Sequence, residues 1–269
     1  MSRTHARQAE TTLHIEERGS GAPLVLLHGW GLNLRVWDGL ARQLAPECRT
    51  LAVDLPGHGQ SPWRFARNEG TLEQQAELIA AILPPRCTLL GWSLGGQIAL
   101  RIASLWPQRV TRLVLIATTP RFVADASWPD ALAPSVLEDF AARLEEDAPG
   151  TVADFLDLQT RGSAGAGQVL AALRKALLEH GLAADAALAA GLSILRTADL
   201  RAELGTIRQP TLVLAGQHDR IAPPAASRAL ASALPHGRYL ELRRGAHAPF
   251  LSHPEWVATQ LRAFLGEGS

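Results

Sequence analysis

The segment Cys87-Thr88-Leu89-Leu90-Gly91-Trp92-Ser93-Leu94-Gly95-Gly96 is an apolar run that ends in the motif G-x-S-x-G. The apolar run predicts a buried strand, and the apolar spacing over residues 94–106 predicts a helix directly after the motif. A serine at a sharp turn between strand and helix holds its hydroxyl within reach of a base, and in that setting the motif indicates a nucleophile. Small glycine neighbours let the strand and the helix approach closely. Ser93 is therefore the candidate catalytic serine; the alternative is an ordinary strand-to-helix turn.

Strand-like and helix-like segments alternate along most of the chain. Continuous apolar runs predict strands covered on both faces, at residues 24–28, 49–54, 88–91, 112–117, 211–215 and 239–242. Helical spacing separates them, at residues 33–45, 71–83, 94–106, 224–233 and 254–265. Residues 11–17 alternate apolar and polar and predict an antiparallel edge strand. These patterns predict an α/β fold with a mostly parallel central sheet and helices on both faces.

The alternation stops between Pro120 and Leu200. This stretch is rich in alanine, leucine and acidic residues, contains no convincing strand, and is broken by prolines and glycines. It predicts several short helices inserted between two strands, as a lid at the strand ends where ligands bind such sheets. The chain then divides into a core, residues 1–119 and 201–269, and a helical lid, residues 120–200. The alternative is a helical subdomain with no role at the site.

Length and composition limit the classes of protein. The chain has 269 residues, 47% hydrophobic and 19% charged, as is typical of a globular protein with a substantial core. Basic and acidic residues number 26 each, which indicates no nucleic-acid or membrane partner. The first ten residues are polar and lack the apolar region of a secretory signal. No apolar run reaches the ~18 residues of a membrane helix, so we expect a cytoplasmic protein.

Cysteine and histidine spacing indicates no metal site. The two cysteines, Cys48 and Cys87, begin apolar runs and are expected to be buried strand residues rather than disulfide partners or metal ligands. The nine histidines contain no H-E-x-x-H motif. The sequence therefore predicts neither a metal nor a cofactor.

A serine nucleophile needs a base, and the base needs an acid that holds its tautomer. Asp219 follows the predicted strand 211–215 in a polar loop and is the best candidate acid; the alternative is a turn or helix-approach aspartate. His247 follows the last predicted strand, between small neighbours, and is the best candidate base. The remaining histidines nearby fit less well, because they adjoin the acid, lie in a turn or precede the last helix: His218, His236 and His253.

The transition state of acyl transfer needs hydrogen-bond donors in place before negative charge develops on oxygen. The backbone N–H of Leu94, directly after the nucleophile at a helix start, is the first candidate. The loop after strand 24–28, His28-Gly29-Trp30-Gly31, supplies the second, which we assign to the N–H of Trp30. The alternative for this loop is a tight turn whose tryptophan simply packs, and both can hold.

From about residue 11 to its end, the sequence resembles the α/β-hydrolase superfamily, through Leu27-His28-Gly29-Trp30-Gly31, residues 54–61 (DLPGHGQS) and residues 91–96 (GWSLGG). With residues 30–33 (WGLN), 155–160 (FLDLQT) and 246–254 (AHAPFLSHP), it also resembles the BioH carboxylesterases. The resemblance implies an α/β-hydrolase fold and a triad of Ser93, Asp219 and His247. It also implies hydrolysis of the methyl ester of pimeloyl-acyl carrier protein in biotin synthesis, together with short-chain carboxyl esters.

The resemblance further implies a set of residues around the bound ester. Phe155 would contact the acyl chain from the lid; the alternative is an aromatic residue of the lid's own core. At helical spacing Phe155, Leu158 and Gln159 lie on one helix face, which fits a pocket wall. The implied substrate-binding residues are Trp30, Ser93, Leu94, Phe155, Leu158, Gln159 and His247.

The charge of the lid bears on a carrier-protein partner. Residues 120–200 include six basic and twelve acidic residues, so the lid has a net charge of −6. Acyl carrier proteins are acidic, and a negative lid disfavours their encounter. Charge acts locally, within ~8 Å at physiological salt, so a basic cluster such as Arg161, Arg174 and Lys175 could still serve.

Other functions use the same catalytic residues, because the fold alone does not choose a substrate. They are a promiscuous short-chain esterase, a C–C bond hydrolase and a proline iminopeptidase. The peptidase would need lid acids such as Asp154 or Asp157 to point inward and hold a substrate ammonium. Serine at position 93 argues against a haloalkane-type hydrolase, which would need aspartate there. From a different class, a ligand-binding receptor could keep a vestigial triad.

Overall fold

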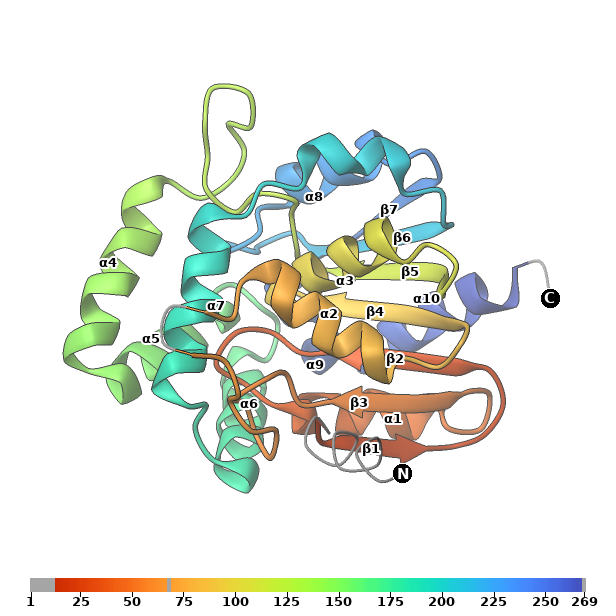
Figure 1. Cartoon of the computed structure of the whole chain (residues 1–269), viewed down its shortest axis with the longest axis horizontal. Coiled ribbons are helices and arrows are strands. Elements are labelled where there is room, and N and C mark those ends of the chain that lie inside the picture. The colour runs from red at the N-terminus through yellow and green to blue at the C-terminus, as the bar shows by residue number, and fades with distance from the viewer. Residues whose placement is uncertain (1–12, 67–68, 268–269) are drawn as a thin grey trace, which may run out of the picture.

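The computed structural model describes residues 13–66 and 69–267, and its centre is a sheet with helical layers on both faces (Figure 1). Within these residues the sheet has seven strands, in the order β1-β3-β2-β4-β5-β6-β7. β1 pairs antiparallel with β3, and every other neighbouring pair is parallel. The strands are β1 (Ile15–Arg18), β2 (Pro23–Leu27), β3 (Arg49–Val53), β4 (Cys87–Trp92), β5 (Val110–Ile116), β6 (Thr211–Gly216) and β7 (Gly237–Leu242).

Burial explains why the apolar runs form strands. β4 and β6 lie inside the sheet, and all six residues of each are buried. A parallel strand with helices on both faces needs apolar side chains on both faces, which produces a continuous apolar run. β1, at the edge, has only half-buried and exposed residues, in line with its alternating sequence. The prediction of a mostly parallel sheet with an antiparallel edge strand is confirmed.

Helices cover both faces of this sheet. α1 (Asp38–Leu44) contacts α10 (Pro254–Gly266) on one face, and α2 (Leu72–Ile82) contacts α3 (Leu94–Leu105) on the other. α8 (Pro224–Ala233) lies against β6 and β7, and the single turn α9 (Pro249–Ser252) leads into α10. The predicted helix at 33–45 is divided. It begins as the 3-10 turn η1 (Leu34–Trp37), capped by the Asn33 side chain, and only then continues as α1, because short 3-10 turns are common where an α-helix begins.

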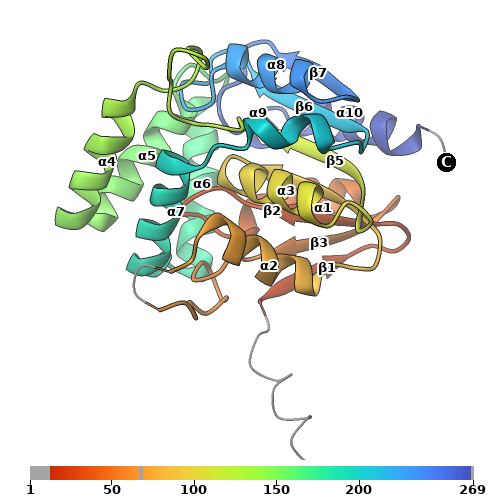
Figure 2. The ribbon, with the colours of Figure 1, turned by 45° about the horizontal axis from the view of Figure 1, so that its top comes forward.

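The stretch between β5 and β6 forms four helices at the carboxyl ends of the parallel strands (Figures 1 and 2). They are α4 (Pro134–Glu146), α5 (Ala148–Thr160), α6 (Ala166–His180) and α7 (Asp185–Thr197). Before them the chain makes only isolated bridges, such as Val123 with Leu132. The insertion thus begins at the carboxyl end of β5, the strand edge at which ligands bind open α/β sheets, and residues 201–210 then return the chain to the amino end of β6.

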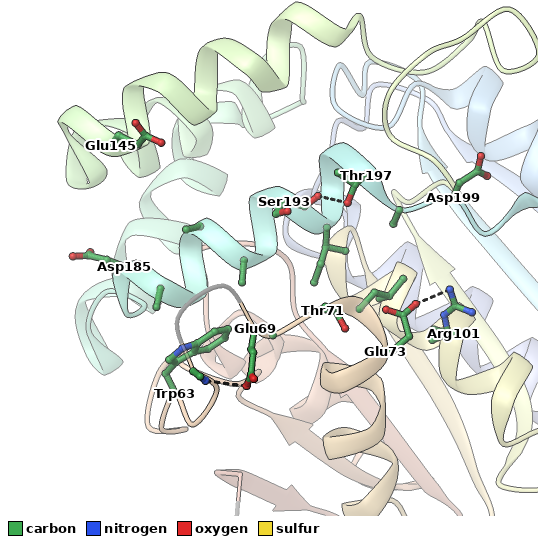
Figure 3. A pocket seen from close by; sticks show the side chains of 18 residues that line it. Trp63, Glu69, Thr71, Glu73, Arg101, Glu145, Asp185, Ser193, Thr197 and Asp199 are labelled. Atoms are coloured by element: carbon green, nitrogen blue, oxygen red, sulfur yellow. Dashed lines mark hydrogen bonds and ion pairs between the residues drawn. The ribbon is translucent and has the colours of Figure 1, made fainter.

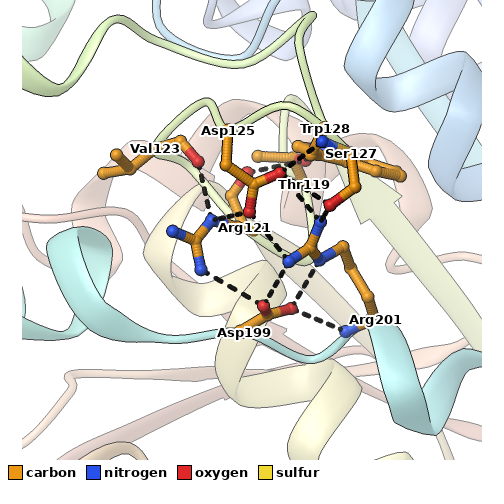
Figure 4. A network of polar contacts seen from close by, with 8 residues as sticks. All are labelled: Thr119, Arg121, Val123, Asp125, Ser127, Trp128, Asp199 and Arg201. Atoms are coloured by element: carbon orange, nitrogen blue, oxygen red, sulfur yellow. Dashed lines mark hydrogen bonds and ion pairs between the residues drawn. The ribbon is translucent and has the colours of Figure 1, made fainter.

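The two ends of the insertion are fastened to each other (Figure 4). The backbone N–H of Leu200 donates to the carbonyl of Pro120 at 3.0 Å. Arg201, at the start of η2 (Arg201–Thr206), donates to Asp125 at 3.0 Å and to Asp199 at 2.6 Å. Hydrogen bonds from Ser127 and Arg201 hold the pKa of the Asp125 carboxyl well below its ordinary value. The insertion therefore leaves and rejoins the core at one cross-linked point.

Two sequence predictions concern residues that lie partly or wholly outside the described ranges, 13–66 and 69–267. The polar first ten residues, and Thr11 and Thr12 of the predicted edge strand, lie outside the described residues. Across residues 13–66 and 69–267, no helix has both the length and the apolar composition needed to cross a membrane.

Candidate active site

Ser93 sits in a strained turn between β4 and α3. Its backbone has φ +55° and ψ −118°, a conformation that residues with a side chain rarely adopt. The turn closes only because two glycines lie against backbone. A Cβ on Gly91 would lie 2.2 Å from the carbonyl oxygen of Gly95, and one on Gly95 would lie 2.5 Å from that of His28. The small residues of the motif therefore have the steric role that the sequence predicted for them.

Hydrogen bonds fix the backbone of Ser93 on both sides. Its N–H donates to the carbonyl of Ile116 at 3.0 Å, and its own carbonyl accepts from the Thr118 hydroxyl at 2.8 Å. Thr118 is held in turn, because its carbonyl accepts from the Ser227 hydroxyl at 3.1 Å. The serine is 1% exposed, at the carboxyl end of the sheet beneath the lid. Thr118 was not singled out in the sequence, since a threonine after a strand carries no distinguishing pattern.

His247 and Asp219 lie against each other, as the sequence predicted for neighbouring strand ends. His247 Nδ1 lies 3.0 Å from Asp219 Oδ1 and 2.9 Å from Oδ2. Both side chains are buried, with exposed fractions of 1% and 0%. Asp219 Oδ1 also accepts the backbone N–H groups of Ile221 and Ala222, at 2.8 and 3.0 Å. The carboxylate is thus oriented to accept the Nδ1 proton, which leaves the lone pair on Nε2.

Two buried polar atoms at this site lack hydrogen-bond partners. Within the described residues, neither Ser93 Oγ nor His247 Nε2 makes a hydrogen bond. Most buried polar atoms in folded proteins are paired, so exceptions need an explanation. The absence of a partner is explained if Ser93 Oγ and His247 Nε2 form their hydrogen bond only when a substrate is bound. Catalytic hydrogen bonds often tighten on substrate binding.

The backbone of His247 is clamped between the lid and the core. Its N–H donates to the carbonyl of Gln159 in α5 at 3.2 Å, and its carbonyl accepts the indole N–H of Trp92 at 2.8 Å. The Trp92 ring also packs edge-to-face against Phe250, with ring centres 4.9 Å apart and the rings nearly perpendicular. Trp92 supports the candidate base directly, a role that spacing in the sequence could not reveal.

The loop after β2 lies beside the serine. A Cβ on Gly29 would be 3.3 Å from Ser93 Cβ, so this backbone passes very close to the candidate nucleophile. Trp30 and Leu94 are both buried, and within the described part of the chain neither backbone N–H donates a hydrogen bond. Two free donors close to a serine are the arrangement that the oxyanion assignment requires.

Two buried histidines hold this loop in place. His28 Nε2 accepts the N–H of Leu55 at 3.0 Å, and His58 Nε2 lies 3.4 Å from the donor nitrogen of Gly31. Each ring also places Nδ1 against a backbone carbonyl, that of Gly29 at 2.8 Å and that of Pro56 at 3.0 Å. This pattern requires the neutral imidazole with its proton on Nδ1. Burial lowers the pKa of both groups, that of His28 well below 6.5 and that of His58 to about 4.

The lid residues predicted to line the substrate pocket differ in their positions. Phe155 is buried, with its ring centre 5.0 Å from that of Trp30 and the rings nearly perpendicular. Gln159 is buried and reaches His247 through its backbone, while neither atom of its side-chain amide has a partner among the described residues. Leu158 is half-buried at the edge of the hydrophobic core. Phe155 and Gln159 are thus brought to the candidate site, while no contact links Leu158 to it.

Helix α7 approaches the site through a glycine that sequence reasoning missed. The indole N–H of Trp30 donates to the carbonyl of Leu188 in α7 at 2.8 Å. One turn further, a Cβ on Gly191 would lie 2.7 Å from Trp30 Cδ1 and 3.1 Å from Leu94 Cδ2. Glycine is unfavourable inside a helix, so its presence at position 191 was the available signal of a close approach.

A cavity of about 1000 Å³ lies beside the lid and away from these residues (Figure 3). Helices α2, α3 and α7 border it, and neither Ser93, Asp219 nor His247 lines it. Among the described residues that line it, Arg101 is the only cation, and it is paired with Glu73 at 2.9 Å and with Glu203 at 2.7 Å. This acidic cavity is therefore not the acyl pocket that the sequence predicts beside Phe155.

The family comparison agrees with this geometry. The family described as the alpha/beta hydrolase fold matches residues 22–254. The chain belongs to this family. A pimeloyl-[acyl-carrier protein] methyl ester esterase of Nitrosomonas europaea is 45% identical to this α/β hydrolase over 244 residues, 91% of the chain and 96% of the relative. A protein of the same name from Xanthomonas oryzae pv. oryzae is 43% identical over 256 residues, 94% of the chain and 98% of the relative. The resemblance to the BioH carboxylesterases is thus confirmed.

Solved structures show the same fold. A thermophilic esterase from Thermogutta terrifontis superposes on the α/β hydrolase with a TM-score of 0.79 at 26% identity, over 94% of this chain and 92% of that one. The enol-lactonase of Burkholderia xenovorans superposes with a TM-score of 0.82 at 26% identity, over 95% and 96%. The prediction of an α/β-hydrolase fold is confirmed.

We predict that Gly191→Ala lowers both the stability and the activity of this α/β hydrolase. Alanine gains ~1 kcal/mol of helix propensity over glycine, but the added methyl would displace Trp30 and Leu94, and such overpacking typically costs ~1–3 kcal/mol. Urea unfolding and kcat/KM on a short aryl ester measure the two effects. Gly167→Ala in α6 is the matched control, because no atom lies within 4 Å of its added methyl. This control variant should be slightly stabilised and fully active. An equal gain in stability in both variants would contradict the close approach of Gly191 to Trp30 and Leu94.

We also predict a pH-dependent loss of stability from His58. Its pKa is about 4 in the folded protein against an ordinary value of 6.5, so the unfolded chain binds the proton first as pH falls. The stabilisation is therefore complete above 6.5 and declines towards pH 4. In His58→Gln, the slope of the unfolding free energy against pH should be smaller in this window. His236→Gln, at an exposed turn, should keep the wild-type slope, and identical slopes in wild type and His58→Gln would refute the prediction.

Proposed function

We propose that this α/β hydrolase is a serine carboxylesterase that hydrolyses the methyl ester of pimeloyl-acyl carrier protein, and short-chain carboxyl esters as well. The observation that carries the proposal is the strained turn of Ser93 at the same strand edge as the buried Asp219–His247 pair. Relatives that share 43–45% of its residues over nearly their whole length bear the name of that esterase, which supports the substrate. The proposal includes the location predicted from the sequence, which is the cytoplasm.

In the first half of the reaction, His247 Nε2 takes the proton of Ser93 Oγ while Oγ bonds to the ester carbonyl carbon. The carbonyl oxygen becomes an oxyanion and is stabilised by the N–H groups of Trp30 and Leu94. The tetrahedral intermediate then breaks its bond to the methoxy oxygen. His247 gives its proton to this oxygen, so that methanol leaves and the acyl group stays on the serine.

The second half repeats these steps with water. His247 takes a proton from the water as its oxygen attacks the acyl carbon, and the same two N–H groups hold the new oxyanion. The bond to Ser93 Oγ breaks, the proton returns to Oγ, and the free carboxylic acid leaves. Throughout, Asp219 keeps the Nδ1 proton facing it and stabilises the imidazolium that forms twice. No other group is required for the proton balance.

The charges of the lid restrict where an acidic carrier protein could dock. Of the three lid cations named from the sequence, Arg174 pairs with Asp157 at 3.3 Å and Lys175 with Glu179 at 3.6 Å. Arg161 is exposed and has no ion pair within the described residues. The turn after it lies against the loop between β7 and His247, because the N–H of Ala164 donates to the carbonyl of exposed Arg244 at 2.9 Å. We propose that Arg161 and Arg244 form the docking surface, next to the site.

The iminopeptidase alternative gains no support from the lid. Asp154 and Asp157 have side chains that are 55% and 44% exposed, and they pair with Arg143 and Arg174 at the surface. Neither is turned inward, where the ammonium group of a peptide substrate would lie. The specific observations therefore favour ester chemistry over an aminopeptidase.

Ser93→Ala should lower kcat by ~10⁴-fold or more on every substrate, and Asp219→Asn by ~10⁴-fold, since a triad acts as a unit. The measurement compares pimeloyl-acyl carrier protein methyl ester with a short aryl ester. Ser232→Ala, an exposed serine on α8, is the control and should keep full activity. Activity that survives in Ser93→Ala would refute the mechanism. A wild-type enzyme that cleaves only the free ester would refute the carrier-bound substrate and leave the mechanism intact.

Reversing the proposed docking charges should affect the carrier-bound substrate alone. In Arg161→Glu combined with Arg244→Glu, KM for pimeloyl-acyl carrier protein methyl ester should rise ~10-fold or more, because like charges then face each other. Hydrolysis of the short aryl ester should not change. Arg208→Glu, an exposed arginine before β6 at the opposite edge of the sheet, is the matched control. An equal rise in KM for the control variant would count against a defined docking surface.

A further inference from the structure

Three potential metal ligands from distant parts of the sequence meet at the border of lid and core. His14 precedes β1, Asp54 follows β3, and His180 is the last residue of α6. One atom of each, a ring nitrogen of the histidines and a carboxylate oxygen of the aspartate, lies within 4.8 Å of the other two. His180 Nδ1 lies 3.5 Å from Asp54 Oδ2. None of these residues belongs to the Ser93–Asp219–His247 site.

The cluster is buried at Asp54 and half-buried at His14, whose side chain is 26% exposed. The side chains of Asp54 and His180 are 0% and 8% exposed. Within residues 13–66 and 69–267, His14 Nε2 and His180 Nδ1 are buried with no hydrogen-bond partner. Buried polar atoms are normally paired, so two free nitrogens that flank a buried carboxylate indicate a missing electrophilic partner.

We propose that this cluster binds a divalent transition-metal ion of the zinc class, through His14 Nε2, Asp54 Oδ2 and His180 Nδ1. Two imidazole nitrogens and one carboxylate oxygen suit such an ion, and a solvent molecule completes a tetrahedral set. Bonds of ~2.0 Å place tetrahedral ligand atoms ~3.3 Å apart. The 3.5 Å between His180 Nδ1 and Asp54 Oδ2 is close to that value. The His14 nitrogen lies within 4.8 Å of both atoms, so closing the site requires the His14 ring to approach the other two ligands.

The surroundings hold the ligands in the required state. Asp54 Oδ1 accepts the N–H of Leu34 at 2.7 Å, and Oδ2 accepts that of Gln60 at 2.9 Å, which leaves one lone pair of Oδ2 free. The Gln60 side-chain nitrogen lies 3.3 Å from His180 Nε2. Because amide oxygen and nitrogen are assigned by their partners, the metal-bound state takes the flipped amide. Its oxygen then accepts the His180 Nε2 proton, and Nδ1 is free to bind the ion.

The charges that face the cluster favour a cation. Asp54 contributes a buried carboxylate, and Glu16 Oε1 lies 3.7 Å from His14 Nε2. Two described arginines lie near Glu16: Arg35 is paired with Glu16 and with Asp38, and Arg18 lies 3.9 Å from Glu16 and 4.0 Å from Asp38. Among the described residues, neither arginine forms an ion pair with the Asp54 carboxylate, so a bound ion would meet net negative charge there.

The ion would join the lid to the core at a point connected to the active site. His180 ends α6, and the neighbouring Asn33 side chain already donates to the carbonyl of Ala176 in that helix at 2.8 Å. Asp54 holds the N–H of Leu34, at the end of the loop that contains Trp30. Metal binding would thus stabilise α6 and the loop beside Ser93 without taking part in ester hydrolysis. The inference is independent of the proposed substrate.

The test measures binding of Zn²⁺ to the untagged full chain after treatment with a chelator and dialysis. Titration calorimetry should give one ion per chain, and Co²⁺ in place of Zn²⁺ should produce the intense visible absorption of a tetrahedral site. Zn²⁺ should also raise the Tm of the wild type. His180→Ala and His14→Ala should each weaken binding by ~100-fold or more, and Gln60→Ala by ~10–100-fold, as for other groups that orient metal ligands.

His236→Ala is the matched control, because His236 is exposed in a turn far from the cluster, and its affinity for Zn²⁺ should equal that of the wild type. Far-ultraviolet circular dichroism of each variant establishes that it is folded; if His180→Ala does not fold, His180→Gln replaces it. Absence of stoichiometric binding to the wild type would overturn the proposal. So would binding that survives in the His180 and His14 variants, since the ion would then occupy another site, such as His247.

Discussion

The close approach of β4 and α3 at Ser93 is the constraint on which the rest of the site depends. A serine at φ +55° is tolerated only when its neighbours leave the backbone room, and Gly91 and Gly95 do so by contacting backbone directly. The strand and the helix, anchored in the core, overdetermine the turn and bear its strain. Hydrogen bonds to Ile116 and Thr118 then fix the backbone of this serine, beside the loop after β2.

The inserted helices contribute hydrogen-bond partners to the candidate site. The backbone of His247 hydrogen-bonds to α5, and the indole of Trp30 hydrogen-bonds to α7, so both candidate base and oxyanion loop have partners in the insertion. The two ends of the insertion are joined through Arg201. A shift of these helices would therefore change the positions of Trp30 and of the candidate base.

Sequence patterns predicted the features that depend on neighbouring residues in the chain, namely the buried strands and the polar residues that follow them. The apolar runs marked the buried strands, and the residues that follow those strands included Ser93, Asp219 and His247. Patterns did not predict the supports of these residues. Trp92 and Thr118 act on backbone groups that belong to other strands or loops, and nothing in their neighbours along the chain marks that partner. His28 and His58 lie within motifs that the sequence showed, but only their burial in the folded protein explains why both imidazoles are neutral.

The sequence by itself determined the order of strands and helices and the position of the insertion, and it supplied the candidates for nucleophile, acid and base, because each is encoded in periodicity or in the few residues after a strand. Only the tertiary structure decided which distant groups meet: Gln159 with His247, Gly191 with Trp30, and His14 with Asp54 and His180. The physical reason is that these contacts depend on how layers pack in three dimensions. A histidine or a glycine far away in sequence gains its role only when packing brings it to its partner.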